Sequence, residues 1–235
     1  MNDRFLRTRM LIGDEAMKKL SSSVVAVFGI GGVGGYVVES LARSGVGKLV
    51  LFDNDTVSES NLNRQIIATT ATIGMSKTAA AKSRALEINP DAEVETHNIF
   101  VLPENIDEID FSHFDYVVDA VDTVSAKLAI IKKAYDLSIP VISSMGTGNK
   151  LDPTAFKISD IYKTSVCPLA RVMRHELKKM GVKKLKVLYS EEEPKKPTFI
   201  PDEQGSKRSV PSSISFVPSV AGLIIGGEVI KDIIK

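Results

Sequence analysis

The glycine-rich run at residues 29–34 constrains the fold of this chain more than any other feature. A short apolar, β-branched run at 23–28 leads into it, and residues 33–44 then place apolar and small side chains at helical spacing. Glycines let the backbone turn tightly and approach a phosphate, whose charge is favoured by the N–H groups and the positive end of the following helix. The four glycines of the run are Gly29, Gly31, Gly32 and Gly34. Together these features predict a strand, a nucleotide-binding turn and a helix.

A carboxylate follows this turn at the spacing that a nucleotide site requires. Residues 48–52 form a second apolar run, and Asp53 comes directly after it, nineteen residues beyond Gly34. An acidic side chain at that point is placed to hydrogen-bond a ribose hydroxyl. This pairing by itself would suit an NAD enzyme as well as any other. The polar stretch 60–65, Ser-Asn-Leu-Asn-Arg-Gln, favours an enzyme that handles a triphosphate, because a dehydrogenase has no need for it.

Side chains suited to a triphosphate follow the ribose carboxylate. Arg64 can make planar, multi-donor contacts with phosphate oxygens. Lys77 lies just after Gly74 at an expected helix start, where its ammonium group can neutralise a phosphate. Asp55 either fixes the turn through an Asx contact or touches the nucleotide, and the sequence leaves both possibilities open. The residues expected to bind nucleotide are Gly29, Gly31, Gly32, Gly34, Asp53, Asp55, Asn61, Asn63, Arg64, Gln65, Lys77 and Asp122.

Asp122 is also the candidate magnesium ligand. It follows an expected strand that ends at Asp119. Magnesium takes oxygen ligands and commonly needs only one or two carboxylates in addition to phosphate. Catalysis would then rest on positioning and electrostatic stabilisation, without an enzyme nucleophile. We expect Asp119 itself to be structural, as a cap or a hydrogen-bond acceptor.

These motifs resemble a known superfamily, the ubiquitin-activating-like adenylyltransferases, which includes the molybdopterin and thiazole biosynthesis activators. The resemblance covers roughly residues 4–150 and rests on Arg4-Phe5 with Arg7, the glycine run, Asp53 with Asp55, the 60–65 stretch, Lys77 and the segment 117–122. Within the superfamily, the chain is similar to the tRNA threonylcarbamoyladenosine dehydratase branch up to about residue 180. That similarity rests on Asn89-Pro90, Gly146-x-Gly148, Asp152-Pro-Thr154, the segment 160–164 and the segment 167–171.

The resemblance implies an ATP- and magnesium-dependent enzyme that adenylates the threonylcarbamoyl carboxylate on tRNA and then cyclises it. It also implies a cytoplasmic homodimer in which an arginine near the start reaches the partner's ATP. Arg7 best matches that arginine, with Arg4 and Arg9 close by. The implied catalytic set is Asp122, Arg64, Lys77 and Arg7. A sulfur-carrier or cysteine-desulfurase system is a further possible partner.

Two other functions compete with this interpretation. One is activation of the C-terminal carboxylate of a small sulfur-carrier or ubiquitin-like protein, and the other is a non-catalytic NAD- or nucleotide-sensing module. The chain has one cysteine, Cys167, which excludes an internal disulfide and a four-thiolate zinc site. Serines lie around Ser212 to Ser215, at positions 212, 213 and 215, where superfamily members often place a catalytic cysteine. Both facts disfavour transfer to a modifier protein, and Cys167 is expected to be a buried small apolar residue.

The charge is nearly balanced overall, at +1, but it is unevenly distributed. Residues 91–122 contain ten acidic residues and no Lys or Arg, whereas residues 171–186 contain seven basic residues and one acidic residue. The basic run lies on an expected amphipathic helix that starts at Pro168 and ends at Gly181. It is either a solvated face or a tRNA-binding surface, formed by Arg171, Arg174, Lys178, Lys179, Lys183 and Lys184.

The alternation of apolar runs predicts an α/β fold: a doubly wound, Rossmann-like, mainly parallel sheet with helices on both faces and a C-terminal extension. We expect one domain over 1–235, with a core at 20–150 and an extension at 151–235. Strands are expected near 24–28, 48–52, 93–98, 115–119, 140–144 and 154–158, and helices near 33–44, 76–88, 103–109, 124–137 and 216–234.

The C-terminal part is expected to be partly irregular and to stay out of the membrane. Residues 191–213 are rich in proline and charge, which favours a loop or crossover. Residues 209–227 are uncharged, but Pro211 and Pro218 make them a poor membrane span. The Gly222-x-x-x-Gly226 spacing favours close packing of a buried or dimer-facing helix. The first twenty residues lack a secretory signal, since they have five basic side chains and no continuous apolar core.

Overall fold

The computed structural model describes residues 3–199 and 211–235. A seven-stranded sheet with the order β3-β2-β1-β4-β5-β7-β6 lies at its centre. Neighbouring strands are parallel except for β6, which runs antiparallel to β7 at one edge. The strands are β1 (Val24–Phe28), β2 (Lys48–Phe52), β3 (Glu93–His97), β4 (Tyr116–Asp119), β5 (Val141–Ser144), β6 (Phe156–Asp160) and β7 (Lys186–Ser190). The predicted doubly wound, Rossmann-like fold is confirmed.

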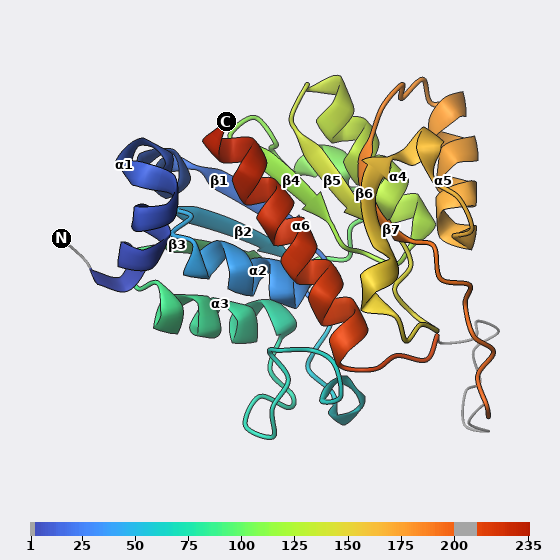
Figure 1. Cartoon of the computed structure of the whole chain (residues 1–235), viewed down its shortest axis with the longest axis horizontal. Helices are drawn as coiled ribbons and strands as arrows, with labels where there is room; N and C mark the ends of the chain where they lie inside the picture. Colours follow the sequence, from blue (N-terminus) through green and yellow to red (C-terminus); the bar gives the residue numbers. More distant parts are fainter. Residues whose placement is uncertain (1–2, 200–210) are drawn as a thin grey trace.

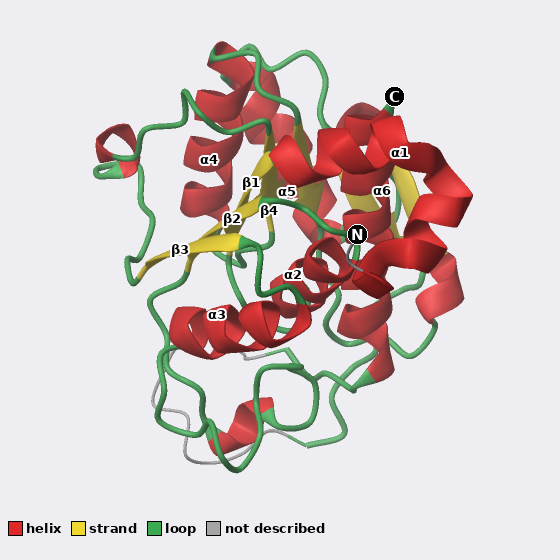
Figure 2. Cartoon of the chain, turned by 90° about the vertical axis from the view of Figure 1, so that its left-hand side faces the viewer, coloured by secondary structure: helices red, strands yellow, loops and turns green. Residues whose placement is uncertain are grey.

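Helices cover both faces of this sheet (Figures 1 and 2). They are α1 (Leu6–Ser22), α2 (Gly34–Arg43), α3 (Lys77–Ile88), α4 (Val124–Asp136), α5 (Pro168–Lys179) and α6 (Phe216–Ile234). Buried residues of α1, α2, α3 and α6 share one apolar core with the sheet, and α4 and α5 contribute to the cores on the other face. Short 3₁₀ turns occur at Asp3–Phe5, Glu59–Asn61, Ile106–Glu108, Pro153–Ala155 and Ile161–Lys163.

The central strands are buried on both faces, as is usual for a parallel sheet. Val25 and Val27 of β1 pack into the core that contains α2 and α6. The alternate residues, Ala26 and Phe28, pack into the core on the α4 face. Phe28 also stacks on Phe52 of β2, with their ring centroids 4.3 Å apart. This packing fixes the carboxyl ends of β1 and β2 beside one another.

Helix α6 crosses one face of the sheet and packs closely on α2 (Figure 1). A Cβ atom on Gly222 would lie 2.4 Å from the carbonyl oxygen of Val33, and one on Gly226 would lie 2.7 Å from the side chain of Ser40. The predicted packing role of these two glycines is confirmed. In the part of the chain that the structure describes, no helix is long and apolar enough to cross a membrane.

One expectation about local structure was wrong, and two elements were not predicted. The helix expected at 103–109 is only a 3₁₀ turn, because the side chain of Asn105 accepts from the Leu102 amide and the following aromatic residues turn into the core. The sequence interpretation also missed α1 and β7. Residues 191–199 and 211–215 form no regular element, as expected, and residues 200–210 of that predicted loop lie outside the described residues.

Candidate nucleotide-binding site

A cavity of about 480 Å³ opens at the carboxyl ends of the parallel strands β1, β2 and β4. This edge is where open α/β sheets bind ligands. Most residues predicted to bind nucleotide line it together. They are Gly29, Gly31, Gly32, Asp53, Asp55, Asn61, Arg64, Gln65, Lys77 and Asp122.

Two glycines in the turn after β1 are required by space and backbone conformation. Gly29 has a φ of +85°, and a Cβ atom there would lie 2.8 Å from the carbonyl carbon of Ala120. A Cβ atom on Gly34 would lie 1.8 Å from the carbonyl oxygen of Gly29. Any larger residue at either position would push the turn away from the strand ends. The turn therefore stays close enough to the sheet for its amides to face the cavity.

Asp53 connects this turn to the end of β2. Its Oδ2 accepts a hydrogen bond from the Ile30 amide at 2.6 Å, and its Oδ1 accepts one from the Asp55 amide at 2.8 Å. A carboxylate has about four acceptor positions, so these two bonds leave capacity for ribose hydroxyls. Asp53 is therefore held at the cavity edge in the position expected for ribose recognition.

Lys77 and Asp55 form an ion pair beside the cavity. The Lys77 Nζ lies 2.6 Å from Asp55 Oδ2, and the side chains are 8% and 59% exposed. The backbone of Lys77 also donates to the Asp55 carbonyl at 3.0 Å, which fixes the start of α3 against the end of β2. Asp55 therefore holds Lys77 in this structure, a third role beyond the two that the sequence left open.

The polar stretch 60–65 presents a cation and an amide to the cavity. Arg64 donates through Nη1 to the Ser60 carbonyl and to Asn63 Oδ1, both at 2.8 Å. Gln65 is 6% exposed, and its buried Oε1 has no hydrogen-bond partner among the described residues. A buried polar atom without a partner is costly, and it is expected where a ligand supplies the partner. Gln65 therefore fits a cavity that holds a polar ligand.

Asp122 and Asp119 differ sharply in their surroundings. Asp122 is exposed at the cavity, where its Oδ1 lies 3.4 Å from the Thr123 hydroxyl. Asp119 is fully buried and pairs with Lys127 Nζ at 3.0 Å. Asp119 is therefore structural, as expected from the sequence. Asp122 instead keeps an exposed carboxylate at the cavity.

The donor set fits magnesium only with help from a bound phosphate. The described residues contain no group of three or more His, Cys, Asp or Glu side chains that could hold a metal ion by themselves. Asp122 contributes one carboxylate, whereas Asp55 is paired with Lys77. Magnesium commonly binds proteins through one or two carboxylates together with substrate phosphates. The residues present therefore fit a magnesium ion that arrives with a nucleotide, held on the protein by Asp122.

Three predicted site residues do not line this cavity. Gly34 lies beneath the turn and permits its close packing. The Asn63 side chain donates to the Ser213 carbonyl at 3.1 Å, so it supports a residue of the cavity wall. Arg7 is exposed on α1, which leads into the opposite end of β1. It does not reach the cavity of its own chain.

The sequence interpretation missed two parts of the cavity wall, residues 99–101 and the start of the C-terminal segment. Pro211 and Ser213 line the cavity from the segment that leads into α6, and Pro218 lines it from the first turn of that helix. Asn149 holds this segment through two hydrogen bonds with Ser212. Its side-chain Oδ1 accepts from the Ser212 backbone amide at 2.8 Å, and its own backbone amide donates to the Ser212 carbonyl at 2.7 Å. Asn149 has a φ of 61°, a conformation that asparagine tolerates better than most residues. The sequence signals for this region were the neighbouring Gly146-x-Gly148 motif and the serines around Ser212 to Ser215.

The basic side chains of the predicted tRNA surface are spread along and below α5. Arg171, Lys178 and Lys179 are exposed on the helix. Arg174 is partly buried, and it donates to the Thr164 carbonyl at 3.0 Å and to the Thr164 hydroxyl. Lys183 and Lys184 are exposed just before β7, at the amino-terminal end of that strand, whereas the cavity lies at the carboxyl ends of the parallel strands. Arg174 therefore stabilises the fold, and the other side chains form a long, discontinuous basic strip.

Fold and cavity together define a nucleotide-binding protein of the Rossmann-like α/β class with a triphosphate-type site. A model of the ThiF family matches residues 5–235, and the chain belongs to that family.

Relatives of known activity match over most of the chain. A tRNA threonylcarbamoyladenosine dehydratase of Bacillus subtilis is 43% identical over a 244-residue alignment that covers 100% of this chain and 96% of that protein. The Escherichia coli protein of the same name is 37% identical over 175 residues, which are 74% of this chain and 65% of its own length. The crystal structure of the E. coli dehydratase TcdA in complex with AMP has a TM-score of 0.90 and 31% identity, and the match covers 98% of this chain and 94% of that one. A structure of the same protein with ATP has a TM-score of 0.88 and 30% identity.

Proposed function

We propose that this chain is an ATP-dependent tRNA threonylcarbamoyladenosine dehydratase, with residues 1–235 forming one catalytic domain that acts in the cytoplasm. The observation that carries the proposal is the convergence of Asp53, Arg64, Lys77 and Asp122 on one cavity. This set suits a triphosphate. The substrate is inferred from the relatives, which are named tRNA threonylcarbamoyladenosine dehydratases and align with nearly all of this chain.

The first step of the reaction activates a carboxylate. An oxygen of the threonylcarbamoyl carboxylate attacks the α-phosphorus of ATP, and pyrophosphate leaves. Asp53 orients the nucleotide through its ribose, while Arg64 and Lys77 offset the negative charge that develops on the phosphates. Magnesium held by Asp122 would supply further positive charge at the phosphates. The enzyme contributes positioning and electrostatic stabilisation, as other phosphoryl and nucleotidyl transfer enzymes do.

The second step closes a ring within the modified nucleoside. An internal nitrogen attacks the activated carbonyl carbon, and AMP leaves with the former carboxylate oxygen. The net change in the nucleoside is loss of one water molecule, and ATP becomes AMP and pyrophosphate. No enzyme nucleophile is needed, which agrees with the burial of the sole cysteine, Cys167, at 2% exposure.

We further propose a homodimer in which Arg7 reaches the cavity of the partner. Arg7 is exposed on α1, far along the chain from the cavity residues, and α1 also exposes Met10 and Leu11 at 78% and 85%. Exposed apolar side chains of this size are typical of an interface. An arginine supplied by a neighbour would complete the positive charge around the phosphates. A sulfur-carrier or cysteine-desulfurase partner stays a prediction from the family resemblance.

The acceptor of the adenylyl group is tested by ATP–pyrophosphate exchange. We expect exchange to require tRNA that bears threonylcarbamoyladenosine, and to be absent with tRNA that lacks this modification. Exchange that requires a small sulfur-carrier or ubiquitin-like protein instead would overturn the proposal in favour of the alternative function. The matched tRNA that lacks the modification is the control, because it keeps the polyanion and removes only the threonylcarbamoyl group that bears the carboxylate.

A further inference from the structure

The loop 120–123, which carries Asp122, rests on a buried ion pair. The pair joins Asp119, at the end of β4, to Lys127, in the first turn of α4, with Nζ 3.0 Å from Oδ2. Both side chains are 0% exposed. A lysine is almost never fully buried unless it is paired, and Lys127 is paired with Asp119.

The pair holds Val121, the residue immediately before Asp122, from two sides. Lys127 Nζ donates to the Val121 carbonyl at 3.0 Å, and the Val121 amide donates to Asp119 Oδ1 at 3.3 Å. Ser143 of β5 donates from its hydroxyl to Asp119 Oδ2 at 2.6 Å, which ties the pair to the next strand. The peptide groups next to Asp122 are therefore held by the buried pair Asp119–Lys127.

The same loop touches the glycine turn. The Ala120 amide donates to the Phe28 carbonyl at 2.8 Å, and a Cβ atom on Gly29 would lie 2.9 Å from the Val121 nitrogen. The loop that carries the proposed metal ligand therefore contacts the proposed phosphate cradle through Ala120 and Val121. A shift of the loop would change the distance between the two.

We propose that Lys127 is a positioning residue that holds Asp122 against the glycine turn for magnesium–nucleotide binding, an inference that rests on the proposed function of this cavity. Burying two charges costs solvation free energy, and a well-packed apolar pair of the same volume is often as stable. An ion pair at this place provides what an apolar pair lacks, which is a donor aimed at the Val121 carbonyl. Residues that orient a metal ligand commonly change metal affinity when they are replaced.

Lys133, on the same helix, provides the matched comparison. Its Nζ donates to the carbonyls of Ile106 and Ile109 at 2.7 and 2.8 Å, and its side chain is 17% exposed. It is therefore also a lysine that binds backbone carbonyls, but its carbonyls lie outside the loop 120–123. A purely structural role for Lys127 predicts similar behaviour of the two lysines.

The test compares magnesium dependence in folded variants. Replacing Lys127 alone leaves Asp119 buried without its partner, so the variant used is the neutral double Asp119→Asn/Lys127→Met, with Lys133→Met as the control. ATP binding is followed by thermal shift at increasing magnesium concentration. We expect the double variant to need about tenfold or more magnesium for the half-maximal shift, while the shift with ATP alone and the magnesium response of Lys133→Met match the parent. A second double variant, Asp119→Asn/Lys127→Gln, keeps a donor near Val121 and should recover part of the magnesium response.

Parental magnesium dependence in the folded Asp119→Asn/Lys127→Met variant would overturn the positioning role. Loss of ATP binding without magnesium would also overturn it, because that result indicates a general collapse of the cavity. The titration needs no tRNA, so it supports or overturns this inference even if the tRNA assay overturns the proposed function.

Discussion

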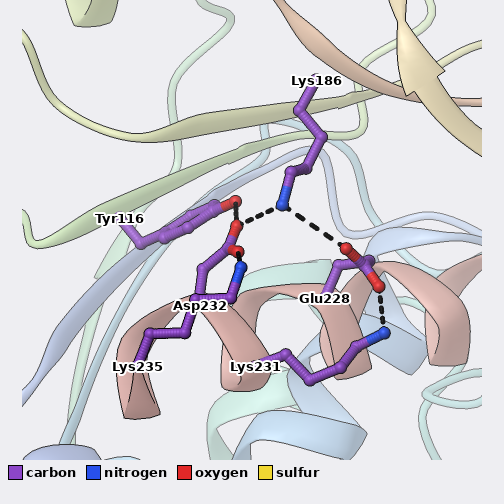
Figure 3. A network of polar contacts seen from close by, with 6 residues as sticks. All are labelled: Tyr116, Lys186, Glu228, Lys231, Asp232 and Lys235. Atoms are coloured by element: carbon purple, nitrogen blue, oxygen red, sulfur yellow. Dashed lines mark hydrogen bonds and ion pairs between the residues drawn. The ribbon is translucent and has the colours of Figure 1, made fainter.

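The two ends of α6 lie near opposite ends of the parallel strands, and the polar groups at these two places find hydrogen-bond partners in different ways. At the start, Pro218 lines the nucleotide cavity, where Gln65 Oε1 has no partner among the described residues and Asp122 is exposed. At the other end, Asp232 accepts from Lys186 at 2.5 Å and from Tyr116 and Lys235, both at 2.8 Å (Figure 3). The polar groups near the start of α6 keep unused hydrogen-bonding capacity. Those near its C-terminal end bind other groups of the protein.

This difference separates the groups that serve binding from those that serve stability. Burial raises the pKa of Asp232, but hydrogen bonds from Lys186, Lys235 and Tyr116 outweigh burial and lower the pKa to about 2. Burial and the neighbouring Asp232 raise the pKa of Tyr116 well above its usual value. The network joins the C-terminal part of α6 to β4 and β7. Substitutions near the start of α6 should therefore lower activity with little change in stability. Substitutions near its C-terminal end should lower stability with little change in activity.

The largest effect is expected for Asp122→Asn at the cavity edge. The substitution removes the charge proposed to hold magnesium and keeps the shape of the side chain, so ATP–pyrophosphate exchange should fall about 100-fold or more. Because Asp122 is exposed, the melting temperature should stay near that of the parent. Exchange kinetics and a thermal melt of the same preparation check both parts. Near-normal turnover in the folded variant would contradict the role of Asp122.

A second large effect is expected when Arg7→Ala and Asp122→Asn chains are mixed. Each variant alone should be nearly inactive, because every cavity in a homodimer then lacks one group. Heterodimers contain one cavity with both groups, so mixed chains should recover part of the parental exchange activity. Native mass spectrometry confirms heterodimer formation. Confirmed heterodimers without recovered activity would count against an arginine supplied by the partner.

A stability effect without a catalytic effect is expected for Asp232→Asn near the C-terminal end of α6. The depressed pKa corresponds to a stabilisation of about 2 kcal/mol at neutral pH, which predicts a melting temperature lower by about 4–8 °C. The folded-state pKa of Asp232 is lowered, so this stabilisation is present above about pH 4, the unfolded pKa, and is lost as pH falls toward 2. The difference between parent and variant should therefore shrink over that window. A constant difference from pH 6 to pH 2 would argue against the charge of Asp232 as its source.

The smallest effect is expected for the basic strip along α5. Replacing Arg171, Lys178 and Lys179 together by Ala should weaken tRNA binding and flatten its salt dependence by roughly 0.7–0.9 in log–log slope per lost phosphate contact. ATP binding should not change, because the cavity lies elsewhere. Arg174→Ala is the control, since it should lower stability through the lost contact with Thr164 and leave the salt slope alone. A triple variant with parental affinity and slope would identify the strip as a solvated face.

The features that the sequence predicted well are local ones. The glycine turn, Asp53, Lys77 and Asp122 were found because each follows a strand or starts a helix whose pattern is visible along the chain. The bounds of β1, β2 and α6 match the expected ranges for the same reason.

The features that it missed depend on contacts between distant residues. Asn149 could not be recognised as a support for Ser212, because the contact joins residues that are 63 positions apart. The prediction of a helix at 103–109 was wrong because Phe111 and Phe114 pack into the core, and this tertiary packing determines the path of the chain there. The burial of Lys127 could not be predicted either, since nothing in the local pattern shows that its ammonium group pairs with Asp119 inside the protein.

The most direct test of the account is nucleoside mass spectrometry on tRNA treated with the purified protein. The tRNA bears threonylcarbamoyladenosine, and the reaction contains ATP and magnesium. The account predicts that the modified nucleoside becomes lighter by one water molecule, with AMP and pyrophosphate formed in equal amounts, and that Asp122→Asn abolishes the change. A nucleoside of unchanged mass after incubation with folded, ATP-binding protein would contradict the account.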